Sequence, residues 1–375
     1  MKDRSESEWT SSAEFVGSID GDVDTARDAP VSGDYDTVDE RGLLWSARGV
    51  DYRQPDPGVL NVTLRVAADG VDLGSYEVYR TTRSSGIVRE VVAEQGFYGD
   101  YYRREGKTNL PAVVFLGGSE GGDSAWAHAS CLAGRGFAVL AIAYRRMPGL
   151  PTKQKRSPLE LITRGIEWLR ARDETTDRVG VVGISAGGTA ALLTIGRAEG
   201  VSAVVAYSSP GVAVPLRLVS RVPPWTFGGE DLPFVRITLG QMLRLLLGPS
   251  GGQAAALSSA LSGRHSAVPW IASGTSVPVL LFAGTDDELI GVDTTRAYAQ
   301  HLKDAGTPVE LREFEGAGHL GRLPGLPAAP ITVATSGVVK RRFGGTAAAN
   351  GRAATESWLK LYAFLVEHVG QPVTP

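Results

Sequence analysis

The sequence predicts an α/β protein in which a small β-sandwich precedes a larger domain built on a mostly parallel sheet. The chain of 375 residues is long enough for two domains. Its first part alternates apolar and polar residues, whereas from Pro111 onward short apolar runs alternate with amphipathic helical segments. We therefore expect a β-domain over residues 1–105 and an α/β domain over 106–375, with the boundary near Arg104–Asn109.

Composition narrows the class of function. Hydrophobic residues make up 43% and charged residues 21%, which are ordinary values for a globular protein. A net charge of -3 gives no electrostatic reason to expect nucleic acid or an anionic membrane as a partner. The single cysteine, Cys131, excludes an internal disulfide, and we expect it to fill the core. We expect no metal ion and no bound cofactor.

We expect no targeting signal in this sequence. The first residues are polar and acidic and lack the apolar stretch of a secretory signal. No run approaches the 18 apolar residues of a membrane-spanning helix. We expect a cytoplasmic protein without membrane insertion.

The N-terminal part carries strand signals only. Val62, Leu64 and Val66 alternate with polar neighbours, and Tyr76–Thr81 and Ile87–Val92 are further strand-like stretches separated by Gly, Asp and Ser. Three such stretches in sequence, with turn residues between them, predict the small β-sandwich.

The second part has short, almost wholly apolar strand candidates. They are residues 113–116, 137–143, 179–184, 203–207, 277–282 and 309–314. The helix before the third strand has a start signal, because Ser157 suits the N-cap, Pro158 the first helical position and Glu160 the third. The alternation stops over about 211–276, where an apolar helix, Leu239–Leu247, is expected. An insertion above a parallel sheet predicts a lid or a pocket wall.

The segment Gly183-Ile184-Ser185-Ala186-Gly187 has the form of a nucleophile elbow. It follows a predicted strand and opens a predicted helix, which is the context that this motif needs. A serine on so sharp a turn is strained, so the residues two positions away on either side must be small. Ser185 is therefore the predicted nucleophile, and the alternative is a capping serine in an ordinary turn.

A serine hydroxyl needs a base to take its proton, and the base follows the nucleophile in the chain order serine, acid, histidine. His319 lies on a glycine-rich loop just after the last predicted strand. His301 and His368 fall within predicted helices and are expected on helix surfaces. His128, in the first helix, and His265, in the insertion, have a small chance of contacting substrate.

The acid is expected after the strand that precedes the histidine strand, where Ala283-Gly284-Thr285-Asp286-Asp287 stands. The fourth position of the turn points toward the histidine in this arrangement, which favours Asp287 over Asp286. Acyl chemistry also needs donors for the developing oxyanion. We expect them to be the backbone N–H of Ala186 and the loop around Gly118 and Ser119.

Several motifs together resemble those of the type I acyl-CoA thioesterases and the related bile acid-CoA:amino acid N-acyltransferases. They are Asp20–Asp24 (DGDVD), Ala29–Tyr35 (APVSGDY), Gly42–Ser46 (GLLWS), Gly96–Gly99 (GFYG), Leu116–Gly122 (LGGSEGG), Ser157–Glu160 (SPLE), Gly316–His319 (GAGH), Gly344–Gly345 and Ser357–Trp358. The resemblance covers nearly the whole chain from about Trp9. It implies an immunoglobulin-like sandwich followed by an α/β-hydrolase domain.

The resemblance also implies the chemistry. The leading hypothesis is hydrolysis of an acyl thioester, with CoA or the phosphopantetheine of an acyl carrier protein as part of the substrate, through an acyl-Ser185 intermediate. The transferase branch of the family favours a cysteine nucleophile, so Ser185 favours hydrolysis. The alternatives are acyl transfer to an amine or alcohol, a plain carboxylesterase and a non-catalytic acyl-binding protein.

Two departures from the family's usual sequence lie near the acyl site. Ala186 and Gly188 stand where the family usually has a lysine and an acidic or polar residue. The segment 269–273 lacks the glutamate that the family usually carries there. Both changes concern the acyl group that is accepted, and they leave the three catalytic positions in place.

The resemblance begins in what would be the middle of the sandwich. A sandwich without its first strands has an unpaired edge. We therefore expect either a natural start upstream of Met1, so that this domain is truncated, or a homodimer whose second subunit covers the edge.

Overall fold

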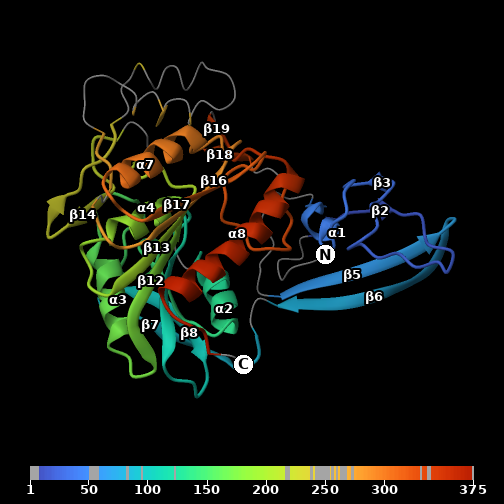
Figure 1. Cartoon of the computed structure of the whole chain (residues 1–375), viewed down its shortest axis with the longest axis horizontal. Helices are drawn as coiled ribbons and strands as arrows, with labels where there is room; N and C mark the ends of the chain where they lie inside the picture. Colours follow the sequence, from blue (N-terminus) through green and yellow to red (C-terminus); the bar gives the residue numbers. More distant parts are fainter. Residues whose placement is uncertain are drawn as a thin grey trace.

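The computed structural model describes residues 8–49, 59–81, 84–93, 96–121, 124–215, 220–236, 268–271, 274–329, 332–335 and 339–373, with the single residues 240, 254, 257, 258 and 261. A large central sheet flanked by helices occupies most of the described chain, and the N-terminal strands lie to one side of it (Figure 1). The fold is α/β, as the sequence predicts.

Eight strands form the central sheet, in the order β17-β16-β13-β12-β9-β10-β8-β7. Their bounds are β7 (Ile87–Val92), β8 (Tyr98–Arg104), β9 (Leu110–Leu116), β10 (Ala138–Ala143), β12 (Thr175–Ile184), β13 (Val201–Tyr207), β16 (Val279–Gly284) and β17 (Val309–Phe314). Neighbours are parallel from β10 to β17, whereas β8 is antiparallel to both β7 and β10. The central strands are apolar throughout because both faces of the sheet are covered.

Helices cover both faces. The side chains of α3 (Glu160–Arg170), α4 (Ala186–Leu193) and α7 (Val292–Asp304) pack into one core cluster. Those of α2 (Trp126–Gly134) and α8 (Ala347–His368) pack into a second cluster on the other face. Because the parallel strands share one direction, the loops after β9, β12, β13, β16 and β17 meet at the carboxyl edge of the sheet.

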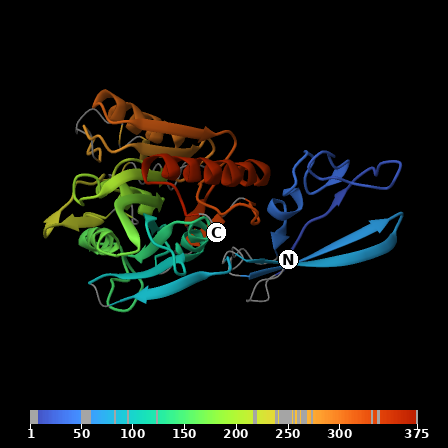
Figure 2. The ribbon, with the colours of Figure 1, turned by 60° about the horizontal axis from the view of Figure 1, so that its bottom comes forward.

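The N-terminal part has strands, but in separate pairs. β1 (Trp9–Thr10) pairs with β4 (Arg48–Gly49), β2 (Ala13–Glu14) with β3 (Ser32–Gly33), and β5 (Val59–Ala68) with β6 (Val71–Thr81), while α1 (Gly42–Trp45) packs near α8. Over residues 8–49 and 59–81 these pairs do not join into the two facing sheets of the predicted immunoglobulin-like sandwich. The hairpin β5–β6 projects away from the central sheet and exposes the apolar side chains of Val66, Leu73 and Tyr76 (Figures 1 and 2).

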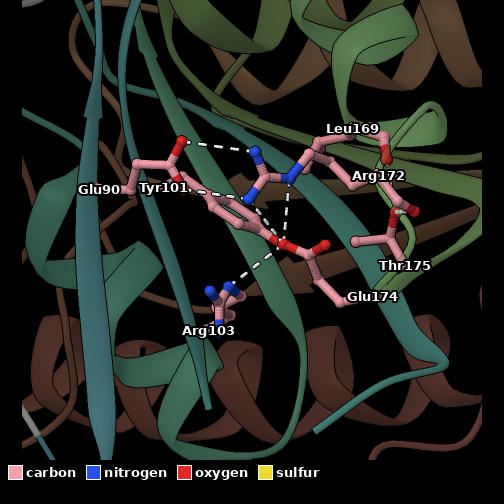
Figure 3. A network of polar contacts seen from close by, with 7 residues as sticks. All are labelled: Glu90, Tyr101, Arg103, Leu169, Arg172, Glu174 and Thr175. Carbon is pink, nitrogen blue, oxygen red and sulfur yellow. Dashed lines mark hydrogen bonds and ion pairs between the residues drawn. The ribbon is translucent and has the colours of Figure 1, made fainter. Parts of the chain in front are cut away.

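The predicted place of Ile87–Val92 in the β-sandwich is wrong. This strand, β7, pairs with β8 along its whole length, and β8 pairs with β10, so the sheet of the α/β part begins before the expected boundary near Arg104–Asn109. A polar network fixes the pair to the rest of the fold (Figure 3). Arg172, which follows α3, donates to Glu90 of β7 at 3.1 Å and to Glu174, which precedes β12, at 2.8 Å. The alternation of apolar and polar residues predicts that a strand forms, but it does not predict which strand lies beside it. For this reason β7 was assigned to the wrong sheet.

The predicted start of the helix at Ser157 is also wrong. Ser157 and Pro158 form the short strand β11 (Ser157–Pro158), which pairs with β14 (Trp225–Phe227), and β14 pairs with β15 (Glu230–Asp231). Backbone bonds from Ser157 N–H to Pro224 and from Leu159 N–H to Thr226 hold the segment extended, so α3 begins only at Glu160.

Other elements complete the described fold. The two-stranded pair β18 (Thr332–Thr335) and β19 (Val339–Arg342) precedes α8. The helix expected over Leu239–Leu247 falls almost entirely outside the described residues, as does His265. Within the part of the chain that is described, no helix has the length and apolar character needed to cross a membrane.

Candidate active site

Ser185 occupies the sharp turn between β12 and α4. Its backbone angles, φ 55° and ψ −115°, lie in a region that a residue with a side chain rarely adopts, and its N–H donates to the carbonyl of Tyr207 at 2.8 Å. Such strain persists only where the surroundings enforce it. The turn holds the partly accessible Ser185 at the carboxyl edge of the sheet, ahead of the N-terminus of α4.

The flanking glycines have a steric reason. A Cβ at Gly183 would lie 2.1 Å from the carbonyl oxygen of Gly187, and a Cβ at Gly187 would lie 2.3 Å from that of Gly117. The same contacts place the loop after β9 directly beside the elbow. Glycine is therefore required two positions on either side of Ser185 because any side chain there would collide with the backbone.

His319 and Asp287 form a buried pair. His319 Nδ1 lies 2.8 Å from Asp287 Oδ2, and the two side chains are only 6% and 1% exposed. The other carboxylate oxygen, Oδ1, accepts from the backbone N–H groups of Leu289 and Ile290 at 2.8 and 2.9 Å. These bonds orient the carboxylate, which fixes the tautomer of the imidazole with a proton on Nδ1 and leaves Nε2 to accept one.

Asp286 contributes to the site through its backbone and not through its carboxylate. Its backbone N–H donates to the carbonyl of Ala317 at 2.9 Å, which joins the acid turn to the histidine loop. The carboxylate that faces His319 belongs to Asp287 and not to its neighbour.

The loops of Ser185 and His319 meet at the end of β13. A Cβ at Gly321 would lie 2.5 Å from Cγ2 of Ile184, which directly precedes Ser185. Within the described structure Ser185 Oγ forms no hydrogen bond with His319, a bond that in ligand-free enzymes often tightens only when substrate binds. The nucleophile candidate and the base candidate thus belong to adjoining loops without yet being bonded.

Two residues hold the histidine loop in a way that the sequence did not predict: Ser208 was not singled out, and His128 was considered only as a possible substrate contact. The buried Ser208, with a positive φ of 45°, accepts from the N–H of Leu320 at 2.8 Å. His128 Nε2 lies 3.0 Å from the carbonyl oxygen of Gly321, and its ring stacks on Phe115. Burial lowers the pKa of His128 to about 4, against the hydrogen bond to that carbonyl, so the ring is neutral and Nε2–H is the donor. Neither residue carries a local motif that could have revealed it.

The glycine-rich loop after β9 supplies free backbone donors. Among the described residues, the N–H groups of Ala186, Gly118 and Ser119 have no hydrogen-bond partner. Tyr144 Oη lies 2.9 and 2.6 Å from the carbonyl oxygens of Gly117 and Gly118, so its single proton is shared between them and the hydroxyl helps to fix the loop. The loop therefore offers N–H groups beside the elbow, as a developing oxyanion requires.

The insertion after β13 lines a pocket of about 470 Å³. Apolar Leu232, Phe234 and Val268 form its walls, and Arg221, Asp231 and Arg236 stand among the polar lining residues. Val235, also in the wall, packs in one cluster with Leu289 and Ile290, whose N–H groups hold Asp287. This places the pocket next to the acid turn.

The remaining candidates lie elsewhere. His301 is on α7, where its ring stacks on Trp270, and His368 ends α8 against Phe364. The partly buried Cys131 lies on α2, and burial raises the pKa of its thiol to about 11, so little thiolate forms near neutral pH. Among the described residues, no group of three or more histidine, cysteine, aspartate or glutamate side chains is arranged to hold a metal ion.

Comparison with known families adds to this geometry. The family described as "BAAT / Acyl-CoA thioester hydrolase C terminal" matches residues 157–371, more than half of the chain and the part that contains Ser185, Asp287 and His319. A second description, "Acyl-CoA thioester hydrolase/BAAT N-terminal region", matches residues 1–94. The chain belongs to the BAAT/acyl-CoA thioester hydrolase family.

Curated relatives of this chain include both acyltransferases and thioesterases. Bile acid-CoA:amino acid N-acyltransferase of Mus musculus is 25% identical, covering 98% of this chain and 90% of that protein. Acyl-coenzyme A thioesterase 1 of Mus musculus is 24% identical, covering 99% and 89%. Among solved structures, Thermogutta terrifontis esterase 2 phosphorylated by paraoxon aligns over 78% of this chain and 97% of that chain, with 19% identity and a TM-score of 0.46.

Proposed function

We propose that this protein is a serine acyl hydrolase that cleaves an acyl thioester of CoA or of a carrier protein through an acyl-Ser185 intermediate. The observation that carries the proposal is the strained Ser185 at the elbow, beside the loop of a histidine whose Nδ1 is held by a buried carboxylate. Family membership supports the thioester as the bond that is cleaved.

The acylation step uses His319 as a base. Nε2 of His319 takes the hydroxyl proton while Ser185 Oγ attacks the thioester carbonyl, and the negative charge moves to the carbonyl oxygen. The N–H groups of Ala186 and of the Gly118–Ser119 region stabilise that oxyanion. When the C–S bond breaks, the protonated His319 gives its proton to the leaving thiolate, and Asp287 stabilises the imidazolium in between.

Deacylation repeats these roles with water. His319 takes a proton from water as it attacks the acyl-Ser185 ester, and returns that proton to Ser185 Oγ when the ester bond breaks. The products are a carboxylic acid and a free thiol. The cycle needs no cofactor apart from the CoA or phosphopantetheine that the substrate brings.

Acyl transfer is the second candidate, because several relatives are named N-acyltransferases. An amine or alcohol would then take the place of water in the second half of the cycle. The two candidates share the acyl-Ser185 intermediate and differ only in its acceptor. The ratio of free acid to conjugate, measured with added glycine, separates them.

The test of the nucleophile is a pair of variants. Ser185→Ala should lower turnover of acyl-CoA substrates, from acetyl to palmitoyl, by about 10⁴-fold or more. Cys131→Ala removes the single thiol of the chain. It should leave turnover unchanged because this thiol is protonated. Intact-mass spectrometry of rapidly quenched wild type should show the acyl adduct on the peptide that contains Ser185. Retention of more than about one hundredth of the activity by Ser185→Ala would exclude the covalent route.

A further inference from the structure

Among the described residues, Arg145 is a buried cation without an ion-pair partner. It lies two residues after the end of β10, at the carboxyl edge of the sheet, and is 3% exposed. Its Nε is inaccessible to solvent and has no hydrogen-bond partner. Within the described residues its guanidinium forms no ion pair.

An unpaired buried charge is costly. Burial lowers the pKa of Arg145, but a guanidinium starts so far above neutral pH that it keeps its proton. Glu120 acts in the opposite direction on this pKa without reaching ion-pair distance, and the neighbouring Arg146 adds a like charge. A buried guanidinium that has no counter-ion among the described residues would be stabilised by an external anion.

The position of Arg145 relates it to the proposed oxyanion loop. A Cβ at Gly121 would lie 2.5 Å from Cγ and 2.8 Å from Nε of Arg145, so the arginine packs directly against that loop. The preceding residue, Tyr144, donates to the carbonyls of Gly117 and Gly118. One short segment therefore fixes the oxyanion loop and places a guanidinium beside it.

We infer that Arg145 binds a carboxylate of the reacting molecules, next to the carbonyl that Ser185 attacks. This inference rests on the proposed acyl transfer to Ser185. A guanidinium presents parallel N–H donors that match a carboxylate in a bidentate contact. The carboxylate has two sources: the far end of a dicarboxylic acyl group, or an amino acid that accepts the acyl group.

The experiment compares matched substrates on Arg145→Gln. Glutaryl-CoA and valeryl-CoA have the same chain length and differ in the terminal carboxylate, and glycine and glycinamide differ in the same way as acceptors. The control is Arg164→Gln, which alters an exposed arginine of α3. Loss of a desolvated guanidinium–carboxylate contact should raise KM by about 30-fold or more.

The outcomes separate the two sources. A rise confined to glutaryl-CoA assigns the carboxylate to the acyl group, and a rise confined to glycine assigns it to the acceptor. An equal loss with valeryl-CoA hydrolysis, or no loss with any of the four, overturns the inference. If the wild-type protein hydrolyses no thioester at all, the proposed function itself is wrong. That result differs from the outcomes above, all of which require an active wild-type enzyme.

Stability provides an independent measurement. Arg145→Met replaces an unpaired buried cation by an apolar side chain of similar length, so the thermal midpoint without substrate should stay the same or rise. A clear fall would mean that Arg145 has an internal counter-ion and serves the fold, which would overturn the inference. Addition of glutarate should raise the midpoint of wild type and not of Arg145→Met if the acyl source is correct.

Discussion

The two edges of the central sheet treat buried arginines in different ways. Toward the amino-terminal ends of the strands, Arg172 is bonded to Glu90 and Glu174 (Figure 3). Its guanidinium also lies 4.7 Å from the centre of the Trp168 ring. At the carboxyl edge, Arg145 is buried without a partner among the described residues. The amino edge pairs its arginine internally, whereas the carboxyl edge leaves one arginine for a ligand.

The pKa of Glu174, at the amino edge, reflects this internal pairing. Burial of Glu174 acts to raise its pKa, but the hydrogen bond from Arg172, a backbone hydrogen bond and the charges of Arg172 and Arg103 together outweigh it, so the pKa lies below its ordinary value. Such a paired carboxylate stabilises the fold at neutral pH. We infer that stability is concentrated at the amino edge and that the carboxyl edge gives up stability for chemistry. Variants at the two edges should therefore separate stability from activity.

The largest expected effect is that of Asp287→Asn. Without the carboxylate on Nδ1, the imidazole of His319 loses its fixed tautomer and the charge that stabilises its protonated form, so kcat should fall by about 10⁴-fold. Asp286→Asn is the matched control, because Asp286 contributes its backbone N–H and not its carboxylate to this site. Turnover kinetics of both variants check the ranking, and a larger loss in Asp286→Asn would move the role to that residue.

Arg172→Met should have the reverse signature. It leaves Glu90 and Glu174 without their main partner, and we expect the free energy of unfolding to fall by about 1–3 kcal/mol while kcat stays unchanged. Arg156→Met is the control at an exposed pair with Asp231, where little change in stability is expected. Urea unfolding and turnover, measured on the same samples, test both statements. A kcat loss in Arg172→Met comparable with that of Asp287→Asn would remove the distinction between the edges.

The sequence predicted those features whose cause is local. Gly183 meets the carbonyl of Gly187 within the same turn, and the alternation of apolar strands with helices gives the α/β class, although the contact that excludes a side chain at Gly187 is with the distant Gly117. What it could not predict depends on partners distant in the chain. Ile87–Val92 has the same periodicity whether it pairs in a sandwich or with β8, and Ser157 has the pattern of a cap although Pro224 draws it into a small sheet.

The same limit applies to the site. Nothing in the segment around Ser208 indicates that its hydroxyl accepts from the N–H of Leu320, because that contact joins residues 112 positions apart. Arg145 stands in an ordinary run after an apolar strand, and only the structure shows that it is buried and unpaired. Sequence motifs therefore identify the residues that react, whereas the structure is needed to find residues that hold the catalytic loops or bind the substrate.

The smallest expected effect concerns pH and His128, at the carboxyl edge. Burial lowers the pKa of this histidine to about 4 in the folded protein, whereas in the unfolded chain it is about 6.5. Between these values the unfolded chain binds more protons, so stability is full above about pH 6.5 and declines as the pH falls toward 4. The decline follows from charging the ring, which is stacked on Phe115 and near Trp358, because the protonated ring keeps its Nε2–H donor to Gly321.

His128→Gln tests this argument because glutamine can donate to the same carbonyl but does not titrate. The thermal midpoint of wild type should fall more between pH 7 and pH 5 than that of the variant, each measured in the same buffers. The two proteins differ at this one residue, so the difference between their curves isolates its contribution. Parallel midpoint curves would show that His128 is not kept neutral by the fold. In that case the neutral donor that we assign to the Gly321 carbonyl would have to be replaced by a charged one.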